Sequence, residues 1–331
     1  MERTAQAGSE ELVLSFLAEA GDAFVSGEAM SGKLGLSRAA VWKHVESLRE
    51  RGYRIDAVAA RGYRLVAIPD RLSPLEVGPL LNTHDVGRPL HYFEEVGSTS
   101  DVAKQLAEEG AEHGEVVVAE AQTAGRGRRG RSWFSAAGRN LAFSVILRPD
   151  LPPQRASELT LVASVALCQA VRDAGVEAGI KWPNDLVYQD RKLAGILTEM
   201  EAEADRVHWV VLGVGVNVNV REAELPEDLR PIATSLAEAR GEPVPRALFL
   251  AAALTRLEEW LDRHAEEGFG PIRAAWRDFS DTLGREVSVR LGDRELVGTA
   301  EDIDDAGALL VRTGGGLERV LSGDVQLLRP R

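Results

Sequence analysis

The sequence predicts a multidomain protein of mixed α/β (α+β) class, with three units at 1–66, 77–283 and 284–331. Three observations predict this organisation. Short amphipathic helices and a hairpin fill the first unit, strands alternate with long apolar helices in the second, and short strands separated by turn residues fill the third. A chain of 331 residues is long enough for two or three domains.

The first unit is predicted to be a winged helix-turn-helix. EELVLSFLAEA predicts a helix over 10–20 with an apolar face of Leu12, Leu14, Phe16 and Leu17. SGEAMSGKLGLSRAAVWKHVESLRERG, residues 26–52, predicts a helix, a glycine-containing turn and a second helix. This second helix has Ser37 as its N-cap and a buried stripe of Val41, Val45 and Leu48. YRIDAVAARGYRL then predicts a two-stranded hairpin, the wing.

Local charge suggests what this unit binds. The whole chain carries a net charge of −13, which argues against coating by nucleic acid. Between 31 and 64, however, eight Lys or Arg stand against three Asp or Glu, a local net charge of +5. We expect the polar face of the second helix to contact DNA through Ser37, Arg38, Lys43 and His44. The alternative is a helical packing module with a solvated basic face.

Composition excludes several other classes. Cys168 is the only cysteine and lies in an apolar run, so we expect a buried thiol and no internal disulfide. The six histidines lack metal-ligand spacing. The start of the chain lacks the layout of a signal peptide, and no apolar run reaches the roughly 18 residues of a membrane span. We therefore expect a soluble cytoplasmic protein that does not bind membranes.

The second unit follows a predicted linker, IPDRLSP, at 68–74. Strands are predicted at 91–96, 115–122, 141–149, 194–201 and 209–218. Helices are predicted at 99–110, 152–175, 246–268 and 271–281. Hairpin-like stretches in the middle of this unit favour a mixed sheet over a purely parallel one. The third unit, with strands from 285 to 328, is predicted to be a small all-β barrel.

The stretch GRGRRGRSWFS, residues 125–135, concentrates positive charge in this acidic chain. Its G-x-G-x-x-G spacing fits a dinucleotide loop, but the residues that follow include Gly138 and are rich in β-formers, where that motif needs a helix. A solvated basic loop is one alternative. A nucleic-acid patch is less favoured, because we expect Trp133 and Phe134 to anchor the end of the loop in the core. The interpretation we favour is a mobile loop whose glycines and arginines close around an anion.

Two further stretches carry polar residues suited to anion chemistry. In KWPNDLVYQDRKLAGI, residues 181–196, two turns between apolar strands bring together Lys181, Asn184, Asp185 and Lys192. Lysine is scarce in this chain, so this pair favours a phosphate- or acyl-handling site over a surface turn. In EVGSTSDVAK, Ser98 or Thr99 is expected to cap a helix whose N-terminus is a weak anion site.

Together these stretches resemble a known family. GSTS (97–100), EAQTAGRGRRGRSWFS (120–135), KWPNDLVYQDRKLAGIL (181–197) and GVGVNVN (213–219) are similar to the motifs of biotin–protein ligases. With the stretch 26–52 ahead of them, the chain resembles the bifunctional form, which is also a biotin operon repressor. The resemblance covers nearly the whole chain in the right order. It implies a central domain like that of class II aminoacyl-tRNA synthetases and an SH3-like C-terminal barrel.

The resemblance also implies a two-step reaction. Biotin and ATP form biotinyl-5′-AMP and diphosphate with the help of Mg²⁺. The biotinyl group then passes to a lysine of the biotin carboxyl carrier protein of acetyl-CoA carboxylase. The adenylate further acts as a co-repressor that favours a homodimer on operator DNA. The alternatives left open are a ligand-sensing repressor without enzyme activity and a ligase for lipoate or octanoate; an oxidoreductase is the weakest.

Carried over position by position, the resemblance assigns roles within this sequence. Catalytic roles go to Arg126, Arg128 and Lys192. Biotin contacts go to Ser98, Thr99, Ser100, Gln122, Arg126, Gly127, Arg128, Lys192 and Gly195. ATP contacts go to Arg131, Lys181, Asn184, Asp185 and Asn217, with Asp185 also the Mg²⁺ ligand. The hydrocarbon chain of biotin is expected to lie against Leu193, Ile196, Val214 and Val216.

The sequence departs from the family pattern at two places. Ser100 stands where members commonly carry Asn or Gln, which puts its contact with the ligand in doubt. The segment 221–241 has no aromatic residue, whereas some bifunctional members place a Trp there to stack on adenine. We therefore expect weaker ordering of this segment by the adenylate, with more effect on regulation than on catalysis.

Overall fold

The computed structural model describes residues 2–291 and 294–328. Its contacts divide the chain into two compact units, 1–71 and 72–331. The predicted second and third units, 77–283 and 284–331, therefore lie within one compact body. No helix in the described parts of the chain is long and apolar enough to cross a bilayer.

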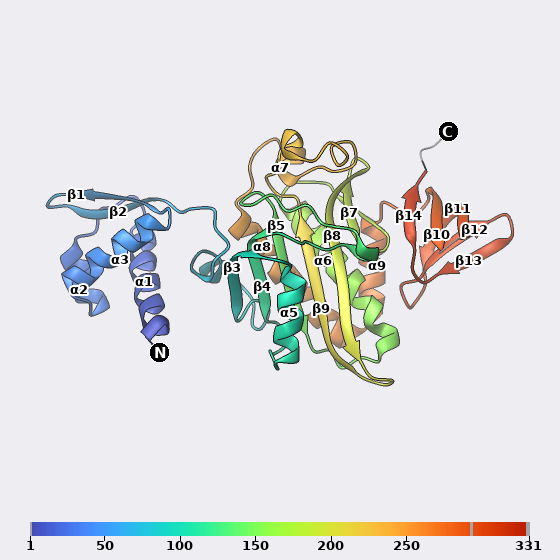
Figure 1. Cartoon of the computed structure of the whole chain (residues 1–331), viewed down its shortest axis with the longest axis horizontal. Coiled ribbons are helices and arrows are strands. Elements are labelled where there is room, and N and C mark those ends of the chain that lie inside the picture. Colours follow the sequence, from blue (N-terminus) through green and yellow to red (C-terminus); the bar gives the residue numbers. More distant parts are fainter. Residues whose placement is uncertain (1, 292–293, 329–331) are drawn as a thin grey trace. The chain divides into compact units, whose positions relative to one another are not determined.

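The N-terminal unit has the predicted helix-turn-helix and wing (Figure 1). Its elements are α1 (Glu2–Glu19), α2 (Gly27–Leu34), α3 (Arg38–Glu50), β1 (Arg54–Val58) and β2 (Gly62–Ala67). Helices α2 and α3 begin at hydroxyl caps, because Ser26 Oγ accepts from Ala29 N at 3.0 Å and Ser37 Oγ accepts from Ala40 N at 3.1 Å. Strands β1 and β2 are antiparallel.

Two predictions for this unit are wrong in the same way. Leu12 is 52% exposed, and Val13 is buried in its place. His44, predicted to lie on the DNA-facing side of α3, is only 9% exposed. Three residues after Val41 and four before Leu48, it shares their buried face. Arg38 and Lys43 remain exposed as predicted.

The predicted linker at 68–74 is also shorter than expected. Leu72 is fully buried in the core of the second unit, and its backbone N–H donates to Glu120 Oε1 at 2.9 Å. Helix α4 (Pro74–Val77) follows at once. An apolar side chain between the two prolines therefore ties the end of this segment to the larger unit.

A seven-stranded mixed sheet forms the centre of the second unit (Figure 1). Its strands are β3 (Leu90–Val96), β4 (Val116–Gln122), β5 (Leu141–Leu147), β6 (Gly179–Lys181), β7 (Asp185–Tyr188), β8 (Arg191–Ala202) and β9 (Val207–Val216). They lie in the order β3-β4-β5-β9-β8-β7-β6. Only the β3–β4 pair is parallel, so the predicted mixed sheet is confirmed among the described residues.

Helices cover both faces of this sheet. The long helices are α6 (Ala156–Asp173), α8 (Arg246–Glu267) and α9 (Phe269–Phe279), and α5 (Thr99–Glu108) lies on the opposite face. Alternation along β4 shows the two faces, because Val116 and Val118 pack in the core that α6, α8 and α9 share, whereas Val117 packs against Ala103 and Ala107 of α5. A short α7 (Leu236–Arg240) and single turns at Gly78–Leu80, Arg128–Gly130, Pro153–Arg155 and Glu222–Glu224 complete the unit.

The C-terminal strands form a five-stranded antiparallel sheet in the order β13-β12-β11-β10-β14. They are β10 (Glu286–Leu291), β11 (Arg294–Ile303), β12 (Leu309–Thr313), β13 (Gly316–Val320) and β14 (Asp324–Leu327). Trp182 Nε1 donates to the Gly307 carbonyl at 3.1 Å, and Arg273 of α9 pairs with Asp302 at 2.9 Å. These contacts join the predicted second and third units into one body.

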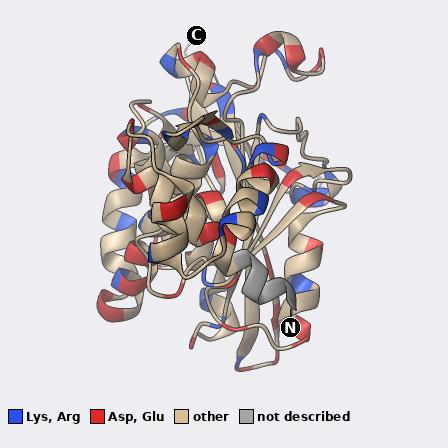
Figure 2. Ribbon diagram, turned by 90° about the vertical axis from the view of Figure 1, so that its left-hand side faces the viewer, with Lys and Arg blue, Asp and Glu red and all other residues tan. Residues whose placement is uncertain are grey.

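Charged residues of both signs are interspersed along the helices (Figure 2). One of them, Glu258 of α8, fixes the approach to β3. Its carboxylate accepts hydrogen bonds of 2.8 Å from the consecutive backbone N–H groups of His84, Asp85 and Val86. Burial opposes ionisation, but these three donors outweigh it and hold the pKa of Glu258 below its usual value.

Replacing Glu258 tests this anchor. A carboxylate with a depressed folded-state pKa contributes stability that is present above the unfolded pKa and is lost as pH falls through the folded pKa. We therefore expect Glu258→Gln to lower the free energy of unfolding by about 2 kcal/mol at pH 7, and by less at pH 3. Urea unfolding at both pH values measures this, with the exposed Glu266→Gln of the same helix as control. An equal loss at both pH values would contradict a role for the charge.

Candidate active site

A cavity of about 270 Å³ lies against strands β8 and β9 of the central sheet. Its walls come from the start of α5, the loop 125–134, the β6–β7 turn, strands β8 and β9, the segment 225–233 and the start of β14. The polar residues and glycines expected to bind the ligands all line it, namely Ser98, Thr99, Ser100, Gln122, Arg126, Gly127, Arg128, Arg131, Lys181, Asn184, Asp185, Lys192, Gly195 and Asn217. The fold thus brings residues from 98 to 217 together around one space.

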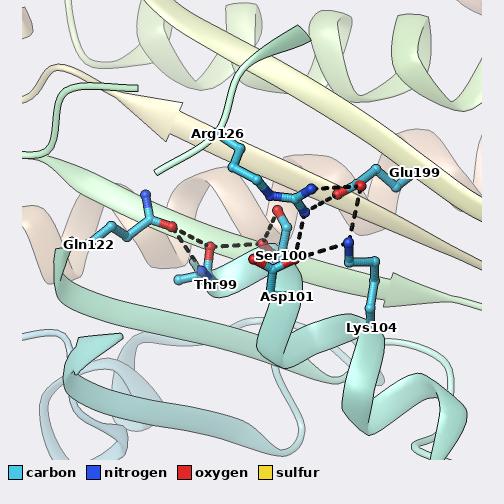
Figure 3. A network of polar contacts seen from close by, with 8 residues as sticks. Thr99, Ser100, Asp101, Lys104, Gln122, Arg126 and Glu199 are labelled. Atoms are coloured by element: carbon cyan, nitrogen blue, oxygen red, sulfur yellow. Dashed lines mark hydrogen bonds and ion pairs between the residues drawn. The ribbon is translucent and has the colours of Figure 1, made fainter. Parts of the chain in front are cut away.

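A network of uncharged polar groups forms one wall. Gln122 Oε1 accepts from both Thr99 N at 2.8 Å and Thr99 Oγ1 at 3.1 Å (Figure 3). The hydroxyl of Ser144 lies 2.9 Å from that of Thr99 and 3.1 Å from that of Ser100. Ser98 occupies the N-cap position of α5, but its side chain makes no capping bond there. Ser98 is therefore the N-cap residue, as predicted, but the expected hydrogen bond from the helix to its hydroxyl is absent.

Glycines of β9 make room for this wall and its neighbour. A Cβ on Gly213 would lie 2.4 Å from Ser100 Oγ, and one on Gly215 would lie 2.4 Å from Trp133 Cε2. Either contact is far below van der Waals distance, so side chains at these positions would displace the cavity wall. The motif GVGVNVN contained this signal, but sequence reasoning gave roles only to its Val214, Val216 and Asn217 and none to its glycines.

The arginine-rich loop is a tight hairpin. Trp133 N donates to Gly125 O at 2.8 Å, and Gly127 N donates to Arg131 O at 2.6 Å. The tip turns through left-handed backbone at Arg129 and Gly130. After one short turn at Arg128–Gly130, the next regular element is strand β5, not the helix that a dinucleotide loop requires.

The four arginines of this loop have different partners. Arg126 forms ion pairs with Glu199 at 2.6 Å and Asp101 at 2.9 Å. Arg129 and Arg131 both pair with Asp324 of β14, at 3.3 Å and 2.7 Å.

Arg128 differs from the other three. Its printed hydrogen-bond partners are neutral, Asn184 Oδ1 at 3.0 Å and the Gly323 carbonyl at 3.4 Å. Burial lowers the pKa of its guanidinium, an effect that the nearby Asp324 opposes. An arginine stays protonated at neutral pH, so Arg128 presents a charge to the cavity that no ion pair among the described residues neutralises.

The two lysines, Lys181 and Lys192, line the same cavity. Lys192 Nζ pairs with Asp185 Oδ1 at 2.7 Å and lies 5.6 Å from the centre of the Trp133 ring. The pKa of Lys181 is lowered, mainly because the ammonium is buried, while Asp185 acts against this shift. The side chains of Asn184 and Asn217 are held by hydrogen bonds to the backbone: Asn184 donates to the Ile196 carbonyl at 2.6 Å, and Asn217 donates to the Thr234 carbonyl at 3.0 Å.

A second loop lies beside the arginine loop. Val220, Leu225 and Ala233 form a small apolar cluster against Phe134 and Ala136. Phe134 therefore anchors to this loop and not to the main core, which corrects the prediction, while Trp133 lines the cavity. Sequence reasoning also missed the apolar residues of this loop that line the cavity: Leu225, Leu229, Ile232 and Ala233.

The predicted apolar lining is half confirmed. Ile196 and Val214 line the cavity, whereas Leu193 and Val216 are buried in the main core and do not reach it. The strands present only some side chains to the cavity, and apolar character alone did not reveal which.

The protein residues in the cavity could supply only part of a Mg²⁺ coordination shell. No group of three or more His, Cys, Asp or Glu side chains suited to a metal occurs in the described parts of the chain. Asp185 offers one carboxylate to the cavity, and its Oδ1 already binds Lys192. Mg²⁺ in nucleotide sites commonly takes one or two carboxylates and completes its shell with phosphates and water. Asp185 is compatible with that arrangement.

Comparison with known proteins places the chain. Family models match residues 92–217 (biotin/lipoate A/B protein ligase family), 282–328 (biotin protein ligase C-terminal domain) and 10–64 (HTH domain). The bifunctional ligase/repressor BirA of Bacillus subtilis is 42% identical over 95% of this chain and 97% of its own length. The chain belongs to the biotin protein ligase family. BirA of Escherichia coli is 33% identical over 92% of this chain and 93% of its own.

A solved structure agrees with this assignment. Biotin protein ligase from Aquifex aeolicus, in complex with biotin and ATP, superposes with a TM-score of 0.64 at 32% identity. The match covers 73% of this chain and 99% of that one. The fold predicted from the sequence is therefore confirmed as that of this family, with its mixed sheet and antiparallel C-terminal sheet.

Gly215→Ala tests the close packing of the cavity wall. The added Cβ would overlap the Trp133 indole, so we expect the ring to move and biotin binding to weaken by about 1–3 kcal/mol. Isothermal titration with biotin measures the change. Gly270→Ala is the control, because a Cβ there meets open space. Unchanged biotin affinity in Gly215→Ala would show that the position of Trp133 is not critical.

Proposed function

We propose that this protein is an ATP-dependent biotin–protein ligase that also acts as a biotin-responsive repressor. One observation carries the ligase proposal: the positive Arg128, Lys181 and Lys192 meet an uncharged polar wall and apolar residues in one cavity. Such a cavity suits a ligand with a polar ring, an apolar chain and an anionic end that must meet a nucleotide. Names of relatives and the Aquifex complex with biotin and ATP support it.

The chemistry proposed for the first step needs no protein nucleophile. A carboxylate oxygen of biotin attacks the α-phosphorus of ATP, a new O–P bond forms, and diphosphate leaves with the electrons of the broken P–O bond. Two anions must approach one another, so the protein contributes by positioning them and by stabilising negative charge. Arg128, bonded to Asn184, and Lys192, paired with the adjacent Asp185, both line the cavity and are placed to do this.

The cavity residues suggest where each substrate binds. The ring system of biotin would lie against Ser98, Thr99 and Gln122, with its chain along Ile196 and Val214. The nucleotide would lie toward the remaining polar residues, Arg131, Lys181, Asn184 and Asn217. Mg²⁺, held by Asp185 and the phosphates, would supply further charge neutralisation.

In the second step, the amine of a carrier lysine attacks the acyl carbon and AMP leaves. The proposed acceptor is the biotin carboxyl carrier protein of acetyl-CoA carboxylase, and the proposed location is the cytoplasm, where ATP and that enzyme occur. Relatives named biotin–[acetyl-CoA-carboxylase] ligase, such as that of Mycobacterium tuberculosis at 37% identity, support this acceptor.

The repressor proposal rests on the N-terminal unit. Helix α3 exposes Arg38 and Lys43 at and near its N-terminus, within a segment of net charge +5. A recognition helix in this fold contacts the major groove with its N-terminal residues. The adenylate is proposed to favour a homodimer that spans two operator half-sites. His44, because it is buried, is not proposed to contact DNA.

Biotin transfer tests the ligase proposal. With biotin, ATP, Mg²⁺ and a carrier domain, we expect the wild type to add one biotin, read as a mass gain on the carrier. Lys192→Ala removes a charge from the reacting centre and should lower kcat by about 10²–10³-fold. The exposed Lys33→Ala, in the other unit, is the control. If biotin binds but is not transferred, the central domain is a ligand sensor without enzyme activity. If lipoate is transferred and biotin is not, the protein is a lipoate ligase.

DNA binding provides the next test. Arg38→Ala and Lys43→Ala should each weaken binding to operator DNA and reduce the salt dependence of log K by about one. His44→Ala should instead lower the melting temperature of the N-terminal unit, because it removes a buried side chain. Gel shifts over a range of salt concentrations and thermal melting separate these effects. A loss of affinity without a change in salt slope would argue against phosphate contacts.

A further inference from the structure

The role of Arg126 follows from the partners of its guanidinium. Nη1 donates to Glu199 Oε1 at 3.1 Å and Nη2 donates to Glu199 Oε2 at 2.6 Å, a two-pronged contact with one carboxylate (Figure 3). Nη2 also lies 2.9 Å from Asp101 Oδ1. Both terminal nitrogens are therefore occupied by carboxylates of the protein. Of its five N–H groups, only one on Nη1 and the one on Nε have no hydrogen-bond partner in the described parts of the chain, and Nε is buried.

Lys104 closes these contacts into a ring. Its Nζ lies 3.0 Å from Asp101 Oδ1 and 3.2 Å from Glu199 Oε1, so two cations alternate with two anions (Figure 3). The four formal charges sum to zero. A ligand carboxylate that entered here would have to displace Glu199, whose side chain is only 25% exposed, from its contact with Arg126, which is unfavourable in a partly buried site. Arg128, by contrast, has only neutral hydrogen-bond partners.

The ring joins three walls of the cavity. Arg126 lies at the base of the arginine hairpin, where it bridges to Ser132, and Glu199 belongs to β8. Asp101 and Lys104 lie one turn apart on α5, the helix whose first residues form the polar wall. A bidentate arginine–carboxylate pair fixes direction as well as distance. Fixing the base of the hairpin sets where its next arginine, Arg128, can reach.

We propose that Arg126 is a positioning residue: through Glu199 and Asp101 it fastens the base of the arginine loop to β8 and α5, so that Arg128, not Arg126, meets the ligand anion. This rests on the proposed ligase function and replaces the catalytic role that the family resemblance implied for Arg126. Anchoring the loop in this way should retain the adenylate, because a looser loop would let this intermediate escape before transfer.

Hydrogen exchange tests the anchor without any ligand. Glu199→Gln keeps the shape of the side chain and removes its charge. We expect exchange in residues 125–133, where the amides of Gly127 and Trp133 are bonded across the hairpin, to speed up about tenfold when this coupled pair is broken. Asp101→Asn should act in the same direction but more weakly. Glu201→Gln, two residues along the same strand and exposed, is the matched control. Unchanged exchange in Glu199→Gln would refute the anchor.

Kinetics distinguish positioning from direct contact. We expect Arg126→Gln and Glu199→Gln each to raise the ratio of adenylate released to biotin transferred by about tenfold, and the double variant to show no more than the larger single effect. If Arg126 met the ligand directly, Glu199→Gln would leave this ratio unchanged or lower the KM for biotin. That outcome would overturn the proposal. A wild type that forms no adenylate would refute the ligase function instead, and hydrogen exchange would still decide the anchor.

Discussion

The structure depends on holding several positive charges around one cavity before any anion arrives. Like charges at this spacing repel one another, and the chain meets this repulsion with acidic partners. Glu199 lies on β8, Asp101 on α5, Asp185 on β7 and Asp324 on β14. Ion pairs therefore tie the arginine loop to the sheet, to the helix on one face and to the C-terminal strands. The domain architecture and the chemistry are linked by this requirement.

The cations around the cavity do not all have a carboxylate partner, and this difference matters for binding an anion. Arg126, Arg129, Arg131 and Lys192 each pair with a carboxylate, whereas Arg128 does not. Neutralised arginines shape the loop and cost little in repulsion. The unpaired one directs a field into a partly buried space, where electrostatic interactions are stronger than in water. An acidic protein can thus attract two anions to one place without a basic surface.

Local patterns in the sequence predicted the elements and the residues that meet in the cavity. These patterns failed to predict which face of a helix is buried and which residues far apart in the sequence form ion pairs. Leu12 was placed on the wrong face of α1, where packing buries Val13 in its place. His44 was placed on the exposed face of α3, although its spacing from Val41 and Leu48 puts it on their buried face. Glu199 lies 73 positions from Arg126, and Asp324 lies 195 positions from Arg129. No spacing rule connects such pairs, so only the fold could reveal the neutralised state of the loop.

Glycines of β8 and β9 leave space for the cavity side chains that pack against these strands. A Cβ on Gly195 would lie 3.1 Å from Lys192 Nζ and 3.4 Å from Asp185 Oδ1, so its absence lets this ion pair lie close against the strand. Gly213 does the same for Ser100, and Gly215 for Trp133. Three glycines on adjacent strands thus accept a hydroxyl, an indole and an ammonium at van der Waals distance from the backbone. The carboxylates hold the arginine loop through ion pairs, and the glycines let Trp133 at its end pack close to the sheet.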